Sequence, residues 1–162
     1  MGLPRAYLLT WTTYGSWLHG DERGSVDDAH HVPGEEFAPA DRRRWSMAAH
    51  RMRAASVMLD AEARRIVAQA IADHCTARRW ELIALHVRTR HVHAIVVAPE
   101  ARPEIVVGQL KAWATRRLRA AGRFPQSDPI WTRQASTRYL WNKESVRRAG
   151  VYVVEQQGEG LP

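Results

Sequence analysis

The 162-residue sequence contains one cysteine, Cys75, and no apolar run long enough for a membrane span or for the core of a signal peptide. A lone cysteine has no partner in its own chain, so a fold held together by disulfides is excluded. Without a membrane-spanning or secretory segment, we expect a cytoplasmic protein. Internal repeats and low-complexity tracts are also missing. The length suits one hydrophobic core, and we expect a single domain over residues 1–162.

Acidic residues are in the minority. The sequence has 17 aspartates and glutamates against 24 lysines and arginines, which gives a net charge of +7. Nearly all of the positive charge is arginine, whose planar guanidinium matches the oxygens of a phosphate. The 7 tryptophans offer stacking surfaces for unpaired bases. A basic protein with a tryptophan-rich core would have the same composition, which therefore favours nucleic-acid binding without requiring it.

The pattern of apolar residues predicts a mixture of strands and helices. Strands are expected at residues 7–14, 80–87, 91–98 and 130–141. Asp60 suits the N-cap of a helix that ends near Arg79, Pro103 the first turn of a helix that Gly122 ends, and Asn142 the cap of a last helix. This order predicts an α+β, ferredoxin-like (RRM-like) fold. It has a mostly antiparallel four-stranded sheet, helices on one face and an added C-terminal helix.

Residues from about 15 to 56 form a long insertion between the first strand and the first helix. Glycine, proline, aspartate, histidine and arginine are frequent in it, and no apolar period is sustained. Segments of this length without regular structure in a compact domain are usually functional or mobile. The sequence does not indicate what this segment recognises.

Two short motifs carry the chemistry. His91 and His93 open a predicted strand, where side chains two residues apart face the same side. Tyr152 and Gln156 are four residues apart on the predicted last helix and share one of its faces. Two imidazoles and an amide oxygen can hold a divalent metal beside a phosphate, and a tyrosine hydroxyl can attack that phosphate. Taken separately, the histidines could be a structural pair and Tyr152 a packing residue.

The motifs resemble those of a known family in their order along the chain. His-Val-His followed by Ala-Ile-Val-Val, and Tyr-Val-Val-Glu-Gln near the C-terminus, are similar to the single-tyrosine HUH transposases. The stretch Leu-Thr-Trp-Thr-Thr-Tyr-Gly-Ser-Trp-Leu at 9–18, and Gly-Asp-Glu-Arg-Gly at 20–24, resemble the REP-associated tyrosine transposases more narrowly. The resemblance spans essentially the whole chain.

The resemblance implies a role for each motif residue. His91, His93 and Gln156 match the ligands of Mg²⁺ or Mn²⁺, and Tyr152 matches the nucleophile. Some members of the family have asparagine where this chain has Gln156. The implied substrate is single-stranded DNA with a hairpin, cleaved to leave a 5′-phosphotyrosine and a free 3′-hydroxyl and then rejoined. Related enzymes include homodimers with shared active sites as well as monomers, and the sequence does not decide between them.

Four basic residues are candidates for contacts with DNA. Arg148 lies four residues before Tyr152 on the same predicted helix face, Lys111 lies on a flank of the second helix, and Arg88 and Arg90 form the turn before the histidines. Each could equally be a solvated surface charge. Two alternative functions also remain open: a DNA hairpin-binding protein with little turnover, and an RNA-binding module, since ferredoxin-like sheets often bind RNA.

Overall fold

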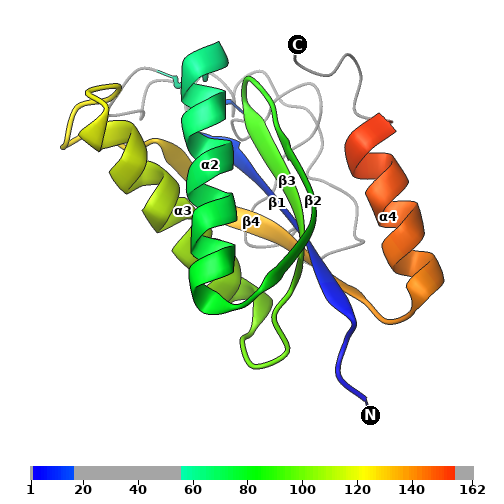
Figure 1. Ribbon diagram of the computed structural model, residues 1–162. Coiled ribbons are helices and arrows are strands. Elements are labelled where there is room, and N and C mark those ends of the chain that lie inside the picture. Colours follow the sequence, from blue (N-terminus) through cyan, green and yellow to red (C-terminus); the bar gives the residue numbers. More distant parts are fainter. Residues whose placement is uncertain (1, 17–55, 156–162) are drawn as a thin grey trace.

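The computed structural model describes residues 2–16 and 56–155. Its elements are, in chain order, β1 (Ala6–Thr13), α2 (Ala61–Arg78), β2 (Glu81–Val87), β3 (His91–Val97), α3 (Pro103–Ala120), β4 (Trp131–Leu140) and α4 (Lys143–Glu155). The four strands form one sheet in the order β2-β3-β1-β4, and every neighbouring pair is antiparallel. This arrangement confirms the predicted α+β fold with a four-stranded antiparallel sheet (Figure 1).

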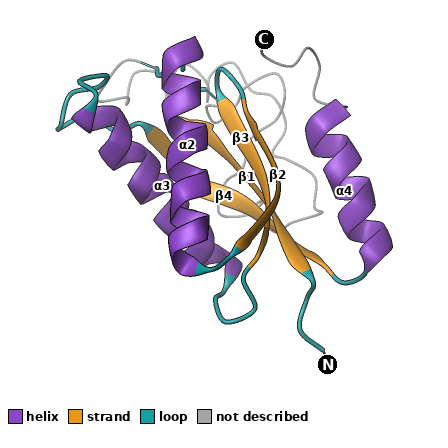
Figure 2. Ribbon diagram, in the orientation of Figure 1, coloured by secondary structure: helices purple, strands orange, loops and turns teal. Residues whose placement is uncertain are grey.

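The two faces of the sheet are covered by different helices. Tyr7, Leu9 and Trp11 alternate along β1 and pack with α2 and α3 in the larger core cluster. Ala6 and Leu8 face the other way and pack with buried residues of α4. Figure 2 shows α2 and α3 on one side of the strands and α4 on the other. The period-two pattern of β1 therefore divides the molecule into a main core and a smaller layer beneath the last helix.

The predicted N-terminal signals of the helices are confirmed. The Asp60 side chain accepts a hydrogen bond from the backbone N–H of Ala63 at 2.8 Å. Pro103 begins α3. The Asn142 side chain accepts from the backbone N–H of Ser145 at 2.8 Å. These bonds satisfy N–H groups that have no carbonyl partner in the first turn of a helix, and so fix where α2 and α4 begin.

Most of the predicted insertion, residues 17–55, lies outside the described residues. Its flanking ends meet at one end of the sheet. The backbone N–H of Val57 donates to the carbonyl of Tyr14 at 2.8 Å, and that of Leu59 donates to the carbonyl of Thr89 in the β2–β3 turn at 2.8 Å. The segment thus leaves the sheet and returns to it at the end where β3 begins.

None of the helices in the described ranges is both long enough and apolar enough to cross a membrane.

Candidate functional site

The sheet places both histidines of the predicted motif on the face that α4 covers. His93 lies opposite Thr10 of β1 and opposite His86 of β2, and His91 lies opposite Thr12. The rings of His91 and His93 have centroids 4.8 Å apart with their planes at 80°. The prediction that the two side chains face the same side is confirmed.

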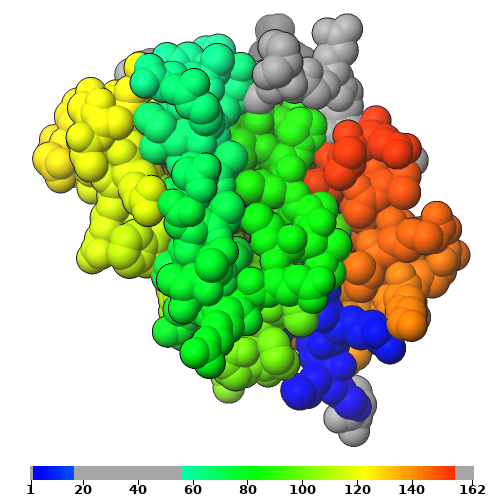
Figure 3. All heavy atoms as spheres, viewed as in Figure 1, coloured from blue at the N-terminus to red at the C-terminus, as the bar shows by residue number. Residues whose placement is uncertain are grey.

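Helix α4 brings Tyr152 to this pair. Ala149 and Val153 are buried against the sheet, while Tyr152 remains 43% exposed. The Tyr152 ring centroid lies 6.1 Å from that of His93, with the planes at 81°. In the space-filling view the orange and red surface of α4 lies beside the green surface of β2 and β3 (Figure 3). Tyr152 and His93, which are far apart in the sequence, therefore lie side by side within one chain.

The hydrogen bond of His93 restricts how its ring can be used. Its Nδ1 lies 2.9 Å from the Thr10 hydroxyl. If Nδ1 donates its proton to that oxygen, Nε2 keeps the lone pair that a metal requires, as is usual for metal-binding histidines. His93 is only 5% exposed, whereas His91 is partly exposed. A ligand therefore has to reach the pair from the side of His91 and Tyr152.

The described residues supply two of the three predicted metal ligands. Gln156 lies outside the described residues, directly after the last helical residue, Glu155. Among the described residues, no group of three or more histidine, cysteine, aspartate or glutamate side chains is arranged to hold a metal ion. Two imidazoles on one face fit a divalent ion that completes its coordination with oxygen atoms, and an amide oxygen belongs to that class. The ligand role of Gln156 stays a prediction.

One residue of this face was missed by the sequence reasoning. His86 lies opposite His93, and its Nδ1 is 3.0 Å from the backbone carbonyl of Val153 on α4. The alternation of side chains along the predicted strand 80–87 could have indicated which face of that strand carries His86. The pairing that sets it beside His93 depends on the register between β2 and β3, which includes an irregularity between Leu82 and Ala84.

The turn between β2 and β3 brings Arg88 and Arg90 to the histidine end of the sheet, as predicted. The backbone N–H of Arg88 donates to the carbonyl of His91 at 2.8 Å. The carbonyl of Arg90 accepts from the N–H of Thr13 at 2.7 Å. Both side chains are partly exposed. In Figure 1 this turn lies at the same end of the molecule as the C-terminal, red end of α4.

Arg148 lies on α4, the helix that carries Tyr152, but forms an ion pair with a neighbouring residue. Its Nε donates to Glu144 at 3.1 Å, and Arg147 donates to the same carboxylate at 2.7 Å. The hydrogen bonds from Arg147 and then Arg148 lower the pKa of Glu144 to about 2. The Arg148 side chain is 76% exposed, so the ion pair is weak and exchangeable.

The structure does not bring Lys111 to the histidine pair. Lys111 lies on α3, which packs on the opposite face of the sheet. Its Nζ donates to the carbonyls of Thr132 at 2.9 Å and Gln134 at 3.4 Å, both on the edge strand β4. Burial lowers the pKa of its ammonium group to about 8. The sequence placed Lys111 on the flank of a helix but did not indicate that its side chain would contact β4.

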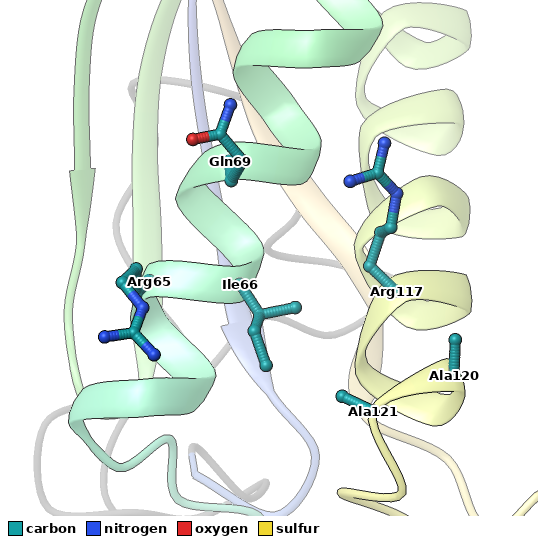
Figure 4. Close-up of a pocket in the computed structure, with 6 residues that line it drawn as sticks. All are labelled: Arg65, Ile66, Gln69, Arg117, Ala120 and Ala121. Carbon is teal, nitrogen blue, oxygen red and sulfur yellow. The ribbon is translucent and has the colours of Figure 1, made fainter.

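A hollow between α2 and α3 is separate from the histidine face. It is lined by Arg65, Ile66, Gln69, Arg117, Ala120 and Ala121 (Figure 4). Its arginines are already paired, Arg65 with Glu62 at 3.9 Å and Arg117 with Asp73 at 3.1 Å. These exposed pairs are weak, but no nucleophile lines the hollow. The histidine face is therefore the better candidate site.

Comparisons with known proteins give a likeness in structure. No protein-family model and no curated protein matches the sequence. A solved REP-associated tyrosine transposase bound to a REP hairpin is similar over 94% of this chain and 66% of the other, with a TM-score of 0.54 and 15% identity. A Deinococcus radiodurans protein described as a transposase is similar over 98% of this chain and 95% of the other, with a TM-score of 0.52 and 16% identity.

The chain has the fold of these transposases. It spans just under two thirds of the length of the REP-associated one, so the likeness concerns this fold and not the remainder of that protein. In this fold, His91, His93 and Tyr152 lie where α4 packs against β3. The resemblance inferred from the motifs and the likeness in structure thus agree on the same group of proteins.

Proposed function

We propose that this protein is a metal-dependent tyrosine transposase or strand transferase that cleaves and rejoins single-stranded DNA at hairpin sequences. One observation carries the proposal: the Tyr152 ring lies 6.1 Å from that of His93, whose ring lies 4.8 Å from that of His91. A tyrosine on α4 beside two histidines of the sheet places a nucleophile next to side chains that can hold a phosphate-polarising metal ion. The REP hairpin bound by the similar transposase supports hairpin DNA as the substrate class.

His91, His93 and Gln156 would hold the metal, Mg²⁺ or Mn²⁺. When bound, the ion would polarise the scissile phosphate and offset its charge as the reaction proceeds. Mg²⁺ prefers oxygen ligands, whereas Mn²⁺ accepts imidazole more readily. We therefore expect Mn²⁺ to support activity at least as well as Mg²⁺.

Tyr152 would be the nucleophile. Its hydroxyl oxygen attacks the scissile phosphorus and loses its proton, forming an oxygen–phosphorus bond to the 5′ end of one fragment. The bond from phosphorus to the 3′ oxygen breaks, and that oxygen takes up a proton to become a free 3′-hydroxyl. Attack by a 3′-hydroxyl on the phosphotyrosine reverses these changes. Since one phosphodiester is exchanged for another, rejoining requires no nucleotide energy source.

Among the described residues, Arg88 and Arg90 are well placed for the DNA backbone, because their turn adjoins the strand that begins with His91. Arg148 would exchange its exposed and weakly held pair with Glu144 for a charge-assisted hydrogen bond to a phosphate oxygen. We do not place Lys111 in this interface, because it is committed to two carbonyls of β4. Its role is to stabilise the edge of the sheet.

Covalent capture tests the proposal. End-labelled single-stranded hairpin DNA is incubated with the protein in Mn²⁺ or EDTA, and denaturing gels are examined for a protein–DNA adduct. Tyr152→Phe and His91→Ala are run beside the wild type. The expected result is an adduct that needs metal and is lost in both variants.

The same experiment distinguishes the alternative functions. Tight binding of the DNA hairpin without an adduct would replace the enzyme with a hairpin-binding protein. Preference for an RNA hairpin of the same sequence would point to an RNA-binding module. An adduct that persists in Tyr152→Phe would refute the assignment of the nucleophile.

A further inference from the structure

A side-chain hydrogen bond ties the end of α4 to the sheet. His86 Nδ1 lies 3.0 Å from the backbone carbonyl oxygen of Val153. A carbonyl oxygen can only accept, so Nδ1 is the donor and carries a proton. The bond therefore joins an inward-facing side chain of β2 to the main chain of the residue that follows Tyr152.

The carbonyl that His86 binds lies in the last turn of α4. Within an α-helix, a carbonyl accepts from the N–H four residues later. For Val153 that donor would belong to residue 157, outside the described residues. A carbonyl oxygen has two lone pairs and can also accept from a side chain, and histidine is a suitable donor near the C-terminal end of a helix. His86 supplies such a donor from a neighbouring strand.

Beside this bond, α4 packs on the sheet through a cluster of apolar side chains. Ala149 and Val153 are buried with Leu8 and Ile95, and Val146 packs against the same cluster. Burial of this kind holds a helix down but is non-directional, so it restricts rotation and sliding only weakly. A hydrogen bond has a preferred length and direction and supplies the missing restriction.

His86 also lies next to the site itself. It is opposite His93 in the β2–β3 ladder, and its acceptor belongs to the residue beside Tyr152. The bond thus connects the strand neighbour of one proposed metal ligand to the neighbour of the proposed nucleophile. A shift at this point would change the distance between Tyr152 and His93 more directly than a shift elsewhere on α4.

We propose that His86 is a positioning residue, which sets Tyr152 against the histidine pair by fixing the C-terminal turn of α4. This inference rests on the proposed function, because it assigns His86 a part in the attack by Tyr152. We assign His86 no contact with the substrate. Its loss should therefore slow formation of the adduct without weakening DNA binding.

Three substitutions at His86 separate the effect of where the hydrogen-bond donor lies from the effect of having a polar side chain. His86→Asn keeps an N–H donor at the same number of bonds from the backbone as Nδ1. His86→Gln keeps the amide but moves it one carbon further, and His86→Leu removes the donor. Val146→Ala is the matched control, because it weakens the apolar packing of α4 and leaves the hydrogen bond in place. Circular dichroism melting verifies that each variant is folded.

The readouts are the first-turnover rate of the adduct at saturating hairpin DNA, the Kd for that DNA, and amide hydrogen exchange over residues 149–155. We expect His86→Leu and His86→Gln to react at least about tenfold more slowly, since a misplacement of about 1 Å can cost about 100-fold in rate. Their Kd should stay within about twofold, and exchange over 149–155 should be faster, because the hydrogen bond that holds this turn to the sheet is lost. His86→Asn should recover most of the rate, and Val146→Ala should keep it.

Wild-type rates in both His86→Leu and His86→Gln would overturn the proposal, as would an equal loss in His86→Asn, His86→Gln and Val146→Ala. If His86→Leu does not fold, the comparison of the two amide variants still decides the question. If the wild type forms no adduct, the proposed function fails. The hydrogen-exchange data alone then test whether His86 holds the end of α4 to the sheet. Faster exchange in His86→Gln than in His86→Asn would then support the hydrogen bond, and equal exchange would refute it.

Discussion

The Thr10 hydroxyl offers a test of the metal site with a built-in control. Thr10 and Thr12 lie two residues apart on β1 and face the same side. The Thr10 hydroxyl is 2.9 Å from His93 Nδ1, whereas the Thr12 hydroxyl is 2.9 Å from that of Thr132. Thr10→Val and Thr12→Val each replace one hydroxyl by a methyl group of similar size. The first removes the hydroxyl that bonds His93, a proposed metal ligand, and the second removes a hydroxyl that bonds Thr132 of β4.

The size of the effect follows from the burial of His93. At 5% exposure, its ring has little access to water that could replace the lost partner. A buried polar atom that loses its partner costs about 1–3 kcal/mol. Losing the outer partner of a metal-binding histidine typically lowers metal affinity about 10- to 100-fold. We expect Thr10→Val to lower the affinity for the metal by an amount in that range. Thr12→Val should change the affinity by less than about threefold, which is the usual scatter of such single-residue effects.

Calorimetric titration with Mn²⁺, in the presence of uncleavable hairpin DNA, measures the affinity directly. The dependence of the adduct rate on Mn²⁺ concentration gives a second value. Both variants should lose a similar amount of stability in urea, about 1 kcal/mol, because each loses one hydrogen bond. Equal Mn²⁺ affinities in the two variants would refute the reasoning and would remove Thr10 from the description of the site.

Three further predictions concern packing, chain assignment and pH. Val153→Ala should lower the free energy of unfolding by about 2 kcal/mol, because Val153 is fully buried, whereas Val154→Ala at a 62% exposed position should change it by less than about 0.5 kcal/mol in urea melts. An equal mixture of Tyr152→Phe and His91→Ala should form no adduct, because one chain supplies both groups; an adduct in the mixture would indicate a site shared between chains. The pKa of Lys111, about 8 when folded against 10.5 otherwise, makes the charged form costly below pH 8. Stability should therefore rise between pH 8 and 10.5, since the unfolded chain binds more protons there, and Lys111→Met should lose that rise in melts across the range.

Local patterns in the sequence were enough for the elements and for the direction of key side chains. Alternation along β3 predicted that His91 and His93 share one face, and Tyr7, Leu9 and Trp11 of β1 follow the same rule. Strand geometry decides these points within a few residues, so distant parts of the chain have no influence on them. The capping residues predicted the helix starts for the same reason, because a cap satisfies N–H groups in its own first turn.

The make-up of the site depended on long-range pairing instead. The neighbours of His93, which are Thr10 on one strand and His86 on another, follow from the register of three strands, and the nearness of Tyr152 follows from the docking of α4. Lys111 and Arg148 looked alike as basic residues on helices. One is committed to the edge strand β4 and the other to Glu144 on its own helix. The sequence by itself thus determined which residues share a face, because that is set by local backbone geometry. The tertiary structure decided which faces meet, because sheet register and helix docking are fixed by contacts between distant segments.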